Sequence, residues 1–252
     1  MPRRARRSRA TVACAVLALA APAAAHAAGT ASVDPNVAGK ASTATIDVSF
    51  DDSGGQNPDS VVVRVARGFK FDPRAVAEKC DKAHAQGNDC PAKSKIGTGT
   101  SDLTVSSTNG LFPPTKTTAA LELFLAPKLQ SGDIAGVVAH YKEASTGRQG
   151  SITGRIVAEA SGTFGLDARF DDIRASLAPP EGFNVHLDRL RASFGAHRTV
   201  KKKVKGKHGK KKVKKIRRNL IRNPKTCAGS WPYEIVVDQN PPESGSAACS
   251  SS

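Results

Sequence analysis

Short segments in which apolar and polar residues alternate recur along most of this 252-residue chain. Residues 43–50 place Ile46, Val48 and Phe50 on one face, and residues 60–67 repeat the pattern with valines. A period of two residues puts one face of an extended strand against a core and the other toward water. Both segments are therefore predicted to be half-buried β-strands.

Further segments of this kind follow, separated by turns rich in Gly, Pro and Asn. They cover residues 98–107, 118–126, 133–142, 151–160, 163–171, 183–194, 218–222 and 233–238. One short helix is predicted over residues 73–80, with Asp72 as its cap and Pro73 as its first residue. Many short strands with a single helix predict an all-β fold, an antiparallel β-sandwich resembling a jelly roll.

The first 27 residues have the three parts of a secretory signal peptide. Five arginines come first, an apolar run over residues 10–21 follows, and Ala25-His26-Ala27 then gives the small-x-small pattern that precedes a cleavage position. The apolar run is shorter than the roughly 20 residues of a transmembrane helix. We expect cleavage after Ala27 and an extracellular or envelope location, without a transmembrane anchor in the mature form. A twin-arginine export signal is the alternative.

The rest of the chain is expected to form one domain. Residues 28–42 are predicted to be a flexible mature N-terminus, and residues 239–252 a tail. The β-sandwich domain would cover residues 43–238, with a basic insertion at residues 198–218.

Four cysteines remain after the signal peptide: Cys80, Cys90, Cys227 and Cys249. An even number in an oxidising compartment indicates disulfides, and four cysteines allow three pairings. We favour Cys80–Cys90 and Cys227–Cys249, because each pair closes a local loop. A zinc site is the alternative, with His84 as the nearby imidazole.

The positive charge of the chain is concentrated in one segment. The net charge is +16, and residues 198–222 contain fourteen Lys or Arg and no acidic residue. Without this segment and residues 1–27, the remaining chain has a net charge of −3. Gly206 and Gly209 predict the tip of a long basic hairpin or loop, with arms over residues 199–205 and 210–217.

This basic segment is the candidate binding site. Lysine attracts phosphates and carboxylates without base specificity, so we expect an anionic cell-wall polymer or another extracellular polyanion as partner. No aromatic residue lies between Phe194 and Trp231, and specific nucleic-acid recognition is therefore not expected. A hairpin that only adds solubility is the other interpretation. The candidate residues are Lys201, Lys202, Lys203, Lys205, Lys207, Lys210, Lys211, Lys212, Lys214, Lys215, Arg217 and Arg218.

The sequence contains no recognisable catalytic motif. His140, His186 and His197 are bases in principle, but the first two lie in strand patterns and are expected at the surface or the edge of the core. The aspartate pairs at residues 51–52 and 171–172 are weak calcium candidates. We expect a non-catalytic protein without metal or cofactor. An extracellular polysaccharide hydrolase or lyase and a nonspecific nucleic-acid binder are the alternatives.

Three stretches resemble a group of uncharacterised secreted proteins of actinobacteria. Residues 71–80 read Phe-Asp-Pro-Arg-Ala-Val-Ala-Glu-Lys-Cys, and residues 90–97 read Cys-Pro-Ala-Lys-Ser-Lys-Ile-Gly. Residues 223–231 read Asn-Pro-Lys-Thr-Cys-Ala-Gly-Ser-Trp. The resemblance covers most of residues 40–240 and implies an exported β-rich domain with disulfides. It implies no activity and no catalytic residues.

Overall fold

The computed structural model describes residues 28–50, 56–159, 162–205 and 211–251. The predicted signal peptide, residues 1–27, lies outside them. Antiparallel strands make up most of the described chain, which confirms the all-β prediction.

Fifteen strands and a few short helical segments are described. The strands are β1 (Ala28–Asp34), β2 (Ala41–Ser49), β3 (Val61–Ala66), β4 (Lys70–Phe71), β5 (Lys95–Ser107), β6 (Thr115–Ala126), β7 (Asp133–Glu143), β8 (Gln149–Ala158), β9 (Phe164–Phe170), β10 (Phe183–Phe194), β11 (His197–Lys205), β12 (Lys211–Asn219), β13 (Ile221–Arg222), β14 (Ser230–Val237) and β15 (Glu243–Ala248). The α-helices are α1 (Lys82–Gly87) and α2 (Ile173–Ser176), and 3₁₀ turns lie at Pro73–Ala75 and Ala92–Ser94.

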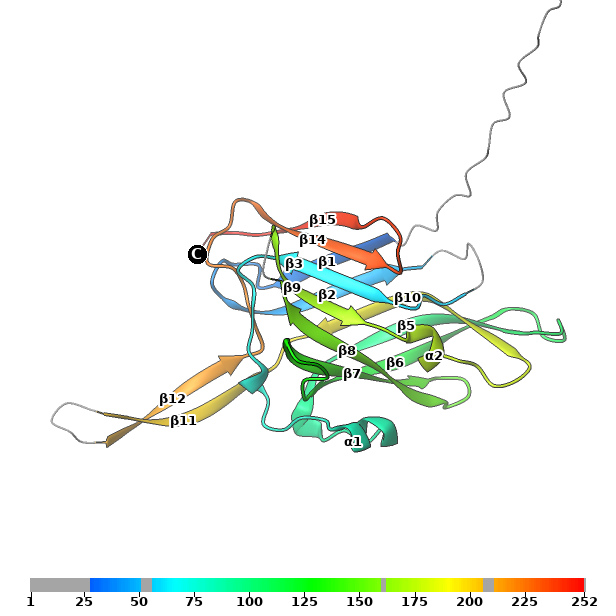
Figure 1. Ribbon diagram of the computed structural model, residues 1–252, viewed down its shortest axis with the longest axis horizontal. Coiled ribbons are helices and arrows are strands. Elements are labelled where there is room, and N and C mark those ends of the chain that lie inside the picture. Colours follow the sequence, from blue (N-terminus) through cyan, green and yellow to red (C-terminus); the bar gives the residue numbers. More distant parts are fainter. Residues whose placement is uncertain (1–27, 51–55, 160–161, 206–210, 252) are drawn as a thin grey trace, which may run out of the picture.

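Thirteen strands share one hydrogen-bonded sheet (Figure 1). Its order is β15-β14-β3-β9-β8-β7-β6-β5-β10-β2-β13-β4, and β1 pairs with the other edge of β2. Strands β5 to β9 are joined consecutively as a meander. Strands β11 and β12 form a separate two-stranded sheet that extends away from this body.

The large sheet curls until its two ends meet. Strand β1 lies beside β15, where the backbone N–H of Gly29 donates to a Glu243 carboxylate oxygen at 2.6 Å. Beyond these strands, Val37 and Ser250 form a parallel bridge. The two layers of the expected sandwich are therefore opposite halves of one curled sheet.

The inner face of the curled sheet forms the main core. Val48 of β2, Val61 of β3, Leu125 of β6 and Ile235 of β14 belong to it and are almost fully buried. Strands β2 and β6 lie far from β3 and β14 in the sheet order, so their shared core holds the two halves together. The alternation that predicted the strands reflects this single buried face.

Two segments expected outside the domain are strands of the sheet. Residues 28–42 were predicted to be flexible, but they contain β1, which pairs with β2 over its whole length. Residues 239–252 were predicted to be a tail, but they contain β15, which pairs with β14. Both predictions are wrong, because backbone pairing can order strands whose side chains are mostly small.

The predicted helix over residues 73–80 is also wrong. Asp72 accepts a hydrogen bond from the N–H of Arg74 as expected, but the helical conformation ends at Ala75. The backbone N–H of Cys80 donates instead to Leu125 of β6. The helix α1 lies in the following loop and begins after Asp81, which caps it.

Both favoured disulfides are present, Cys80–Cys90 and Cys227–Cys249. The first closes the loop that carries α1, and the second connects the approach to β14 with the end of β15. Disulfides of this kind are typical of proteins in oxidising compartments. Within the described ranges, no helix has the length and apolar character needed to cross a bilayer.

We predict that Leu220→Ala lowers the free energy of unfolding by about 2–5 kcal/mol, because Leu220 is fully buried and the substitution leaves a cavity. Leu111→Ala is the matched control, since Leu111 is 74% exposed and its loss should change stability by less than about 0.5 kcal/mol. Chemical denaturation of the two variants measures the difference. Equal destabilisation would contradict the assignment of Leu220 to the core.

Candidate polyanion-binding ribbon

The hairpin of β11 and β12, here called the basic ribbon, extends beyond the body of the protein (Figure 1). It confirms the predicted arms, and the predicted tip at residues 206–209 lies outside the described residues. Nine residues in a strand span roughly 27 Å. Strand β10 leaves the large sheet to become β11, and β12 returns to it as β13 beside β2. The ribbon is therefore an insertion between strands of the body.

The register of the ribbon places like charges directly opposite one another. Lys201 pairs with Lys215, and Lys202 pairs with Lys214. Because successive residues of a strand point to opposite sides, these two pairs lie on opposite faces of the ribbon. Both faces are therefore cationic. Like charges at directly opposed positions destabilise a strand pair, and a two-stranded hairpin is marginally stable alone.

Hydrogen bonds of Asp72 connect the base of the ribbon to the body. One carboxylate oxygen of Asp72 accepts a hydrogen bond from Arg218 at 3.1 Å, and the other accepts from the Nε of Arg74 at 2.7 Å. The Asp72 backbone N–H donates to Leu220, directly after β12. Arg198, opposite Arg218, donates to the Val76 carbonyl. These contacts hold the first residues of the ribbon.

Charge partners keep Asp72 ionised. Burial would raise the pKa of this carboxyl, but hydrogen bonds from Arg74 and Arg218 outweigh it and lower the pKa below 3.8. Because the folded-state pKa is depressed, this ion pair stabilises the folded protein fully at pH values above the pKa of an ordinary carboxyl, and the stabilisation is lost as pH falls through the lower pKa. The ribbon base is thus fixed at neutral pH.

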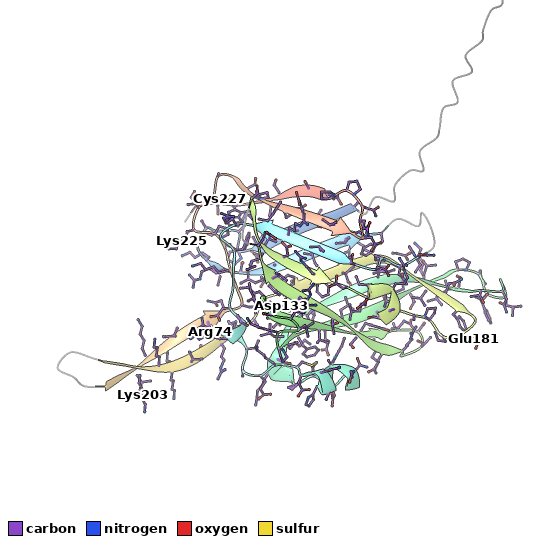
Figure 2. The ribbon with its side chains drawn as sticks, viewed as in Figure 1. Arg74, Asp133, Glu181, Lys203, Lys225 and Cys227 are labelled. Atoms are coloured by element: carbon purple, nitrogen blue, oxygen red, sulfur yellow. A yellow bond between two sulfur atoms is a disulfide. The ribbon has the colours of Figure 1, made fainter. Side chains whose placement is uncertain are left out.

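The predicted site residues fall into three groups. Six residues of the ribbon have exposed side chains: Lys201, Lys202, Lys203, Lys214, Lys215 and Arg217. Figure 2 shows Lys203 on the ribbon, away from the body. Lys205, Lys211 and Lys212 lie on its strands, with side chains outside the described set, and Lys207 and Lys210 lie outside the described residues. Arg218 differs from the rest, because its guanidinium is bound to Asp72 and anchors the ribbon.

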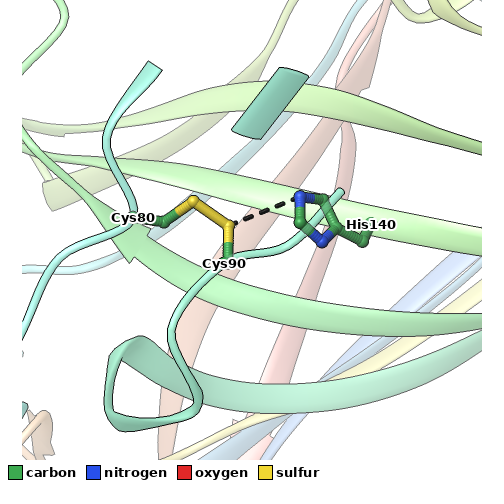
Figure 3. Close-up of side chains that lie close together, drawn as sticks. All are labelled: Cys80, Cys90 and His140. Atoms are coloured by element: carbon green, nitrogen blue, oxygen red, sulfur yellow. Dashed lines mark hydrogen bonds between the residues drawn. A yellow bond between two sulfur atoms is a disulfide. The ribbon is translucent and has the colours of Figure 1, made fainter. Parts of the chain in front are cut away.

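A second feature, the Cys80–Cys90 disulfide, has His140 as its neighbour (Figure 3). The His140 Nε2 lies 3.4 Å from the Cys90 Sγ, and the ring packs against Phe124. Burial lowers the pKa of His140. These three residues form the one group of potential metal ligands found in the described part of the chain. Their sulfur atoms are bonded to each other and are not available as thiolates.

Sequence reasoning named the wrong histidine for this cluster. The Nδ1 of His84 instead lies 2.8 Å from a carboxylate oxygen of Asp81. The hydrogen bond to Asp81 and the negative charge of Asp81 raise the pKa of His84. His140 is 50 positions from Cys90, so no local spacing could have indicated it. It was expected at the surface or the core edge and is buried, as is His186. His197 begins the ribbon.

The remaining acidic candidates are separated or already paired. A carboxylate oxygen of Asp171 lies 3.5 Å from a guanidinium nitrogen of Arg155. The backbone of Asp172, directly before α2, has a left-handed conformation. The pair at residues 51–52 lies outside the described residues. A shallow hollow of about 360 Å³ contains Asp102 and Asp188. Two cations share this hollow, Lys116 and Arg189.

Comparison with known proteins finds no matching family model, no matching curated protein and no matching solved structure.

We predict that Asp72→Asn loosens the ribbon without unfolding the body. The neutral side chain loses the charge that holds Arg74 and Arg218, so amide hydrogen exchange should accelerate at residues 197–203 and 213–219 while β7 stays protected. Asp81→Asn is the control, since Asp81 caps α1 away from the ribbon. Unchanged exchange in the ribbon of Asp72→Asn would contradict the anchoring role.

Proposed function

We propose that this protein is a secreted or envelope-associated, non-catalytic β-domain that binds extracellular polyanions through the basic ribbon. An anionic cell-wall polymer is the partner that fits best with export. The proposal rests on one observation: the ribbon presents lysine on both faces, with like charges directly opposed.

The opposed lysines favour a binding role over a purely solubilising one. Cations added for solubility can be placed anywhere on the surface and do not need to face each other. Here they are concentrated on a narrow hairpin, and within the described ribbon no acidic residue offsets them. A polymer with a negative charge at each unit would relieve this repulsion along the whole ribbon.

The charge of the body also indicates that the ribbon alone binds the polyanion. Outside the signal peptide and the basic segment, the chain has a net charge of −3, so the body would not retain a polyanion by itself. The anchor at Asp72 holds the ribbon away from the body, where both faces are accessible. Binding would therefore be electrostatic, strongly salt-dependent and insensitive to the detailed sequence of the polymer.

Duplex DNA is the second candidate partner, because a two-stranded β-ribbon fits the major groove. The described ribbon offers lysines, which contact phosphates as point charges, and lacks the aromatic side chains that stack on bases. We therefore expect DNA to be bound without sequence preference and more weakly than a flexible polymer.

The test replaces with glutamine the five lysines whose side chains are described as exposed on the ribbon: Lys201, Lys202, Lys203, Lys214 and Lys215. Affinity for poly(glycerol phosphate) is measured over a range of salt concentrations, with duplex DNA in parallel. The wild-type affinity should fall steeply with salt, as expected for counterion release. The substituted ribbon should bind weakly and with a much smaller salt dependence.

A control variant with the same net charge separates the ribbon from general basicity. It carries glutamine at five exposed lysines of the body: Lys82, Lys116, Lys128, Lys142 and Lys225. This variant should retain wild-type affinity and salt dependence. Equal loss of binding in the two variants would contradict a dedicated site, and tighter binding to DNA than to the polymer would favour the nucleic-acid alternative.

A further inference from the structure

The interior of the curled sheet contains two adjoining cavities. The first, here called the seam cavity, has a volume of about 80 Å³ and reaches β1, β14 and β15. The second, the inner cavity, has a volume of about 70 Å³ and lies between β2, β3 and the meander of β5 to β9. Six residues line both: Ile46, Val63, Phe71, Ile156, Ala168 and Phe194.

The lining of these cavities is apolar. Every residue that lines the inner cavity is aliphatic or aromatic, and apolar side chains dominate the seam cavity. A cavity retains water only where several polar groups can bind it, so this interior is expected to exclude water. Protein cores are normally packed with few voids larger than a water molecule. The two neighbouring voids are therefore suited to an apolar molecule, which would gain contacts there without displacing bound water.

The seam between β1 and β15 borders this interior without a continuous strand ladder. In the described chain β1 pairs with β2 and β15 pairs with β14, and the two strands share no ladder. Gly29 and Glu243 meet at one end of the seam, and Val37 and Ser250 meet beyond the other. Between them, the small side chains of Ala31 and Ala247 line the seam cavity. Separating the strands there would break few hydrogen bonds.

We propose that the seam and inner cavities together form a binding site for a small uncharged hydrocarbon ligand. Each cavity is smaller than the roughly 150 Å³ apolar cavity that holds benzene in another protein, but the two adjoin. A ring with a short chain would occupy both. This site is independent of the basic ribbon. Its ligand would carry no charge, because apolar side chains make up the whole lining of the inner cavity and most of the lining of the seam cavity, where the Asp167 carboxylate already accepts a hydrogen bond from Arg169.

The test uses benzene as a probe and pyridine as its polar counterpart of the same shape. Benzene should raise the unfolding temperature of the full chain by roughly 2–4 °C at several times its dissociation constant. It should also shift the methyl resonances of Val63 and Ile156. Pyridine should do neither, because its ring nitrogen would lose its hydrogen bond to water. Absence of a benzene effect, or an equal effect of pyridine, overturns the proposal.

A substitution at the junction of the cavities provides the second readout. Ala168 lies in register between Val63 and Ile156, so Ala168→Leu would place a side chain in the shared space. This variant should fold, unfold at a higher temperature than wild type and lose the benzene effect. Ala120→Leu, on an exposed position of β6, should keep the benzene effect. A destabilised or unfolded Ala168→Leu variant would mean that the space is already filled, and would overturn the proposal.

Discussion

Segregation of charge is the constraint on which the rest of this structure depends. Fourteen cations without one acidic residue cannot enter a core, because an unpaired buried ammonium loses its hydration without compensation. The chain places thirteen of them between β10 and β13, where the inserted ribbon leaves the large sheet intact, and the fourteenth, Arg222, lies in β13. Where the chain leaves the body for the ribbon, the backbone N–H of Gly195 donates to the Ile96 carbonyl. Where it returns, the N–H of Leu220 donates to the Ala196 carbonyl, so the backbone hydrogen bonding continues past the inserted ribbon.

Apolar and charged side chains are also segregated within the body, on opposite faces of the large sheet. Its inner face is apolar, and its outer face carries ion pairs such as Arg64 with Glu234, at 3.1 Å. Curling one sheet on itself buries the inner face without a second sheet, but leaves a seam between β1 and β15 and unfilled space behind it. The basic ribbon is cationic and this interior is apolar, so the two proposed sites would bind different classes of ligand. Each proposal is therefore tested independently of the other.

The sequence predicted the elements whose side chains carry a strong pattern. Half-buried strands such as β2 and β3 alternate visibly, and the charge of the ribbon excluded it from the core. Strand β15 was missed because its residues are mostly small and its order comes from backbone pairing with β14. Two other features were missed: the contact of Cys90 with His140, and the hydrogen bond from the Gly29 N–H to Glu243 that joins β1 to β15. Both are contacts between residues far apart in the sequence, and no local spacing indicates them.

The most direct test of the account is a chemical-shift map of the protein during titration with a short poly(glycerol phosphate) fragment at low salt. The account predicts that perturbed amides cluster on the basic ribbon, around Lys201–Lys203 and Lys214–Lys215, and that added salt reverses them. Perturbations concentrated on the body, with the ribbon unchanged, would contradict it.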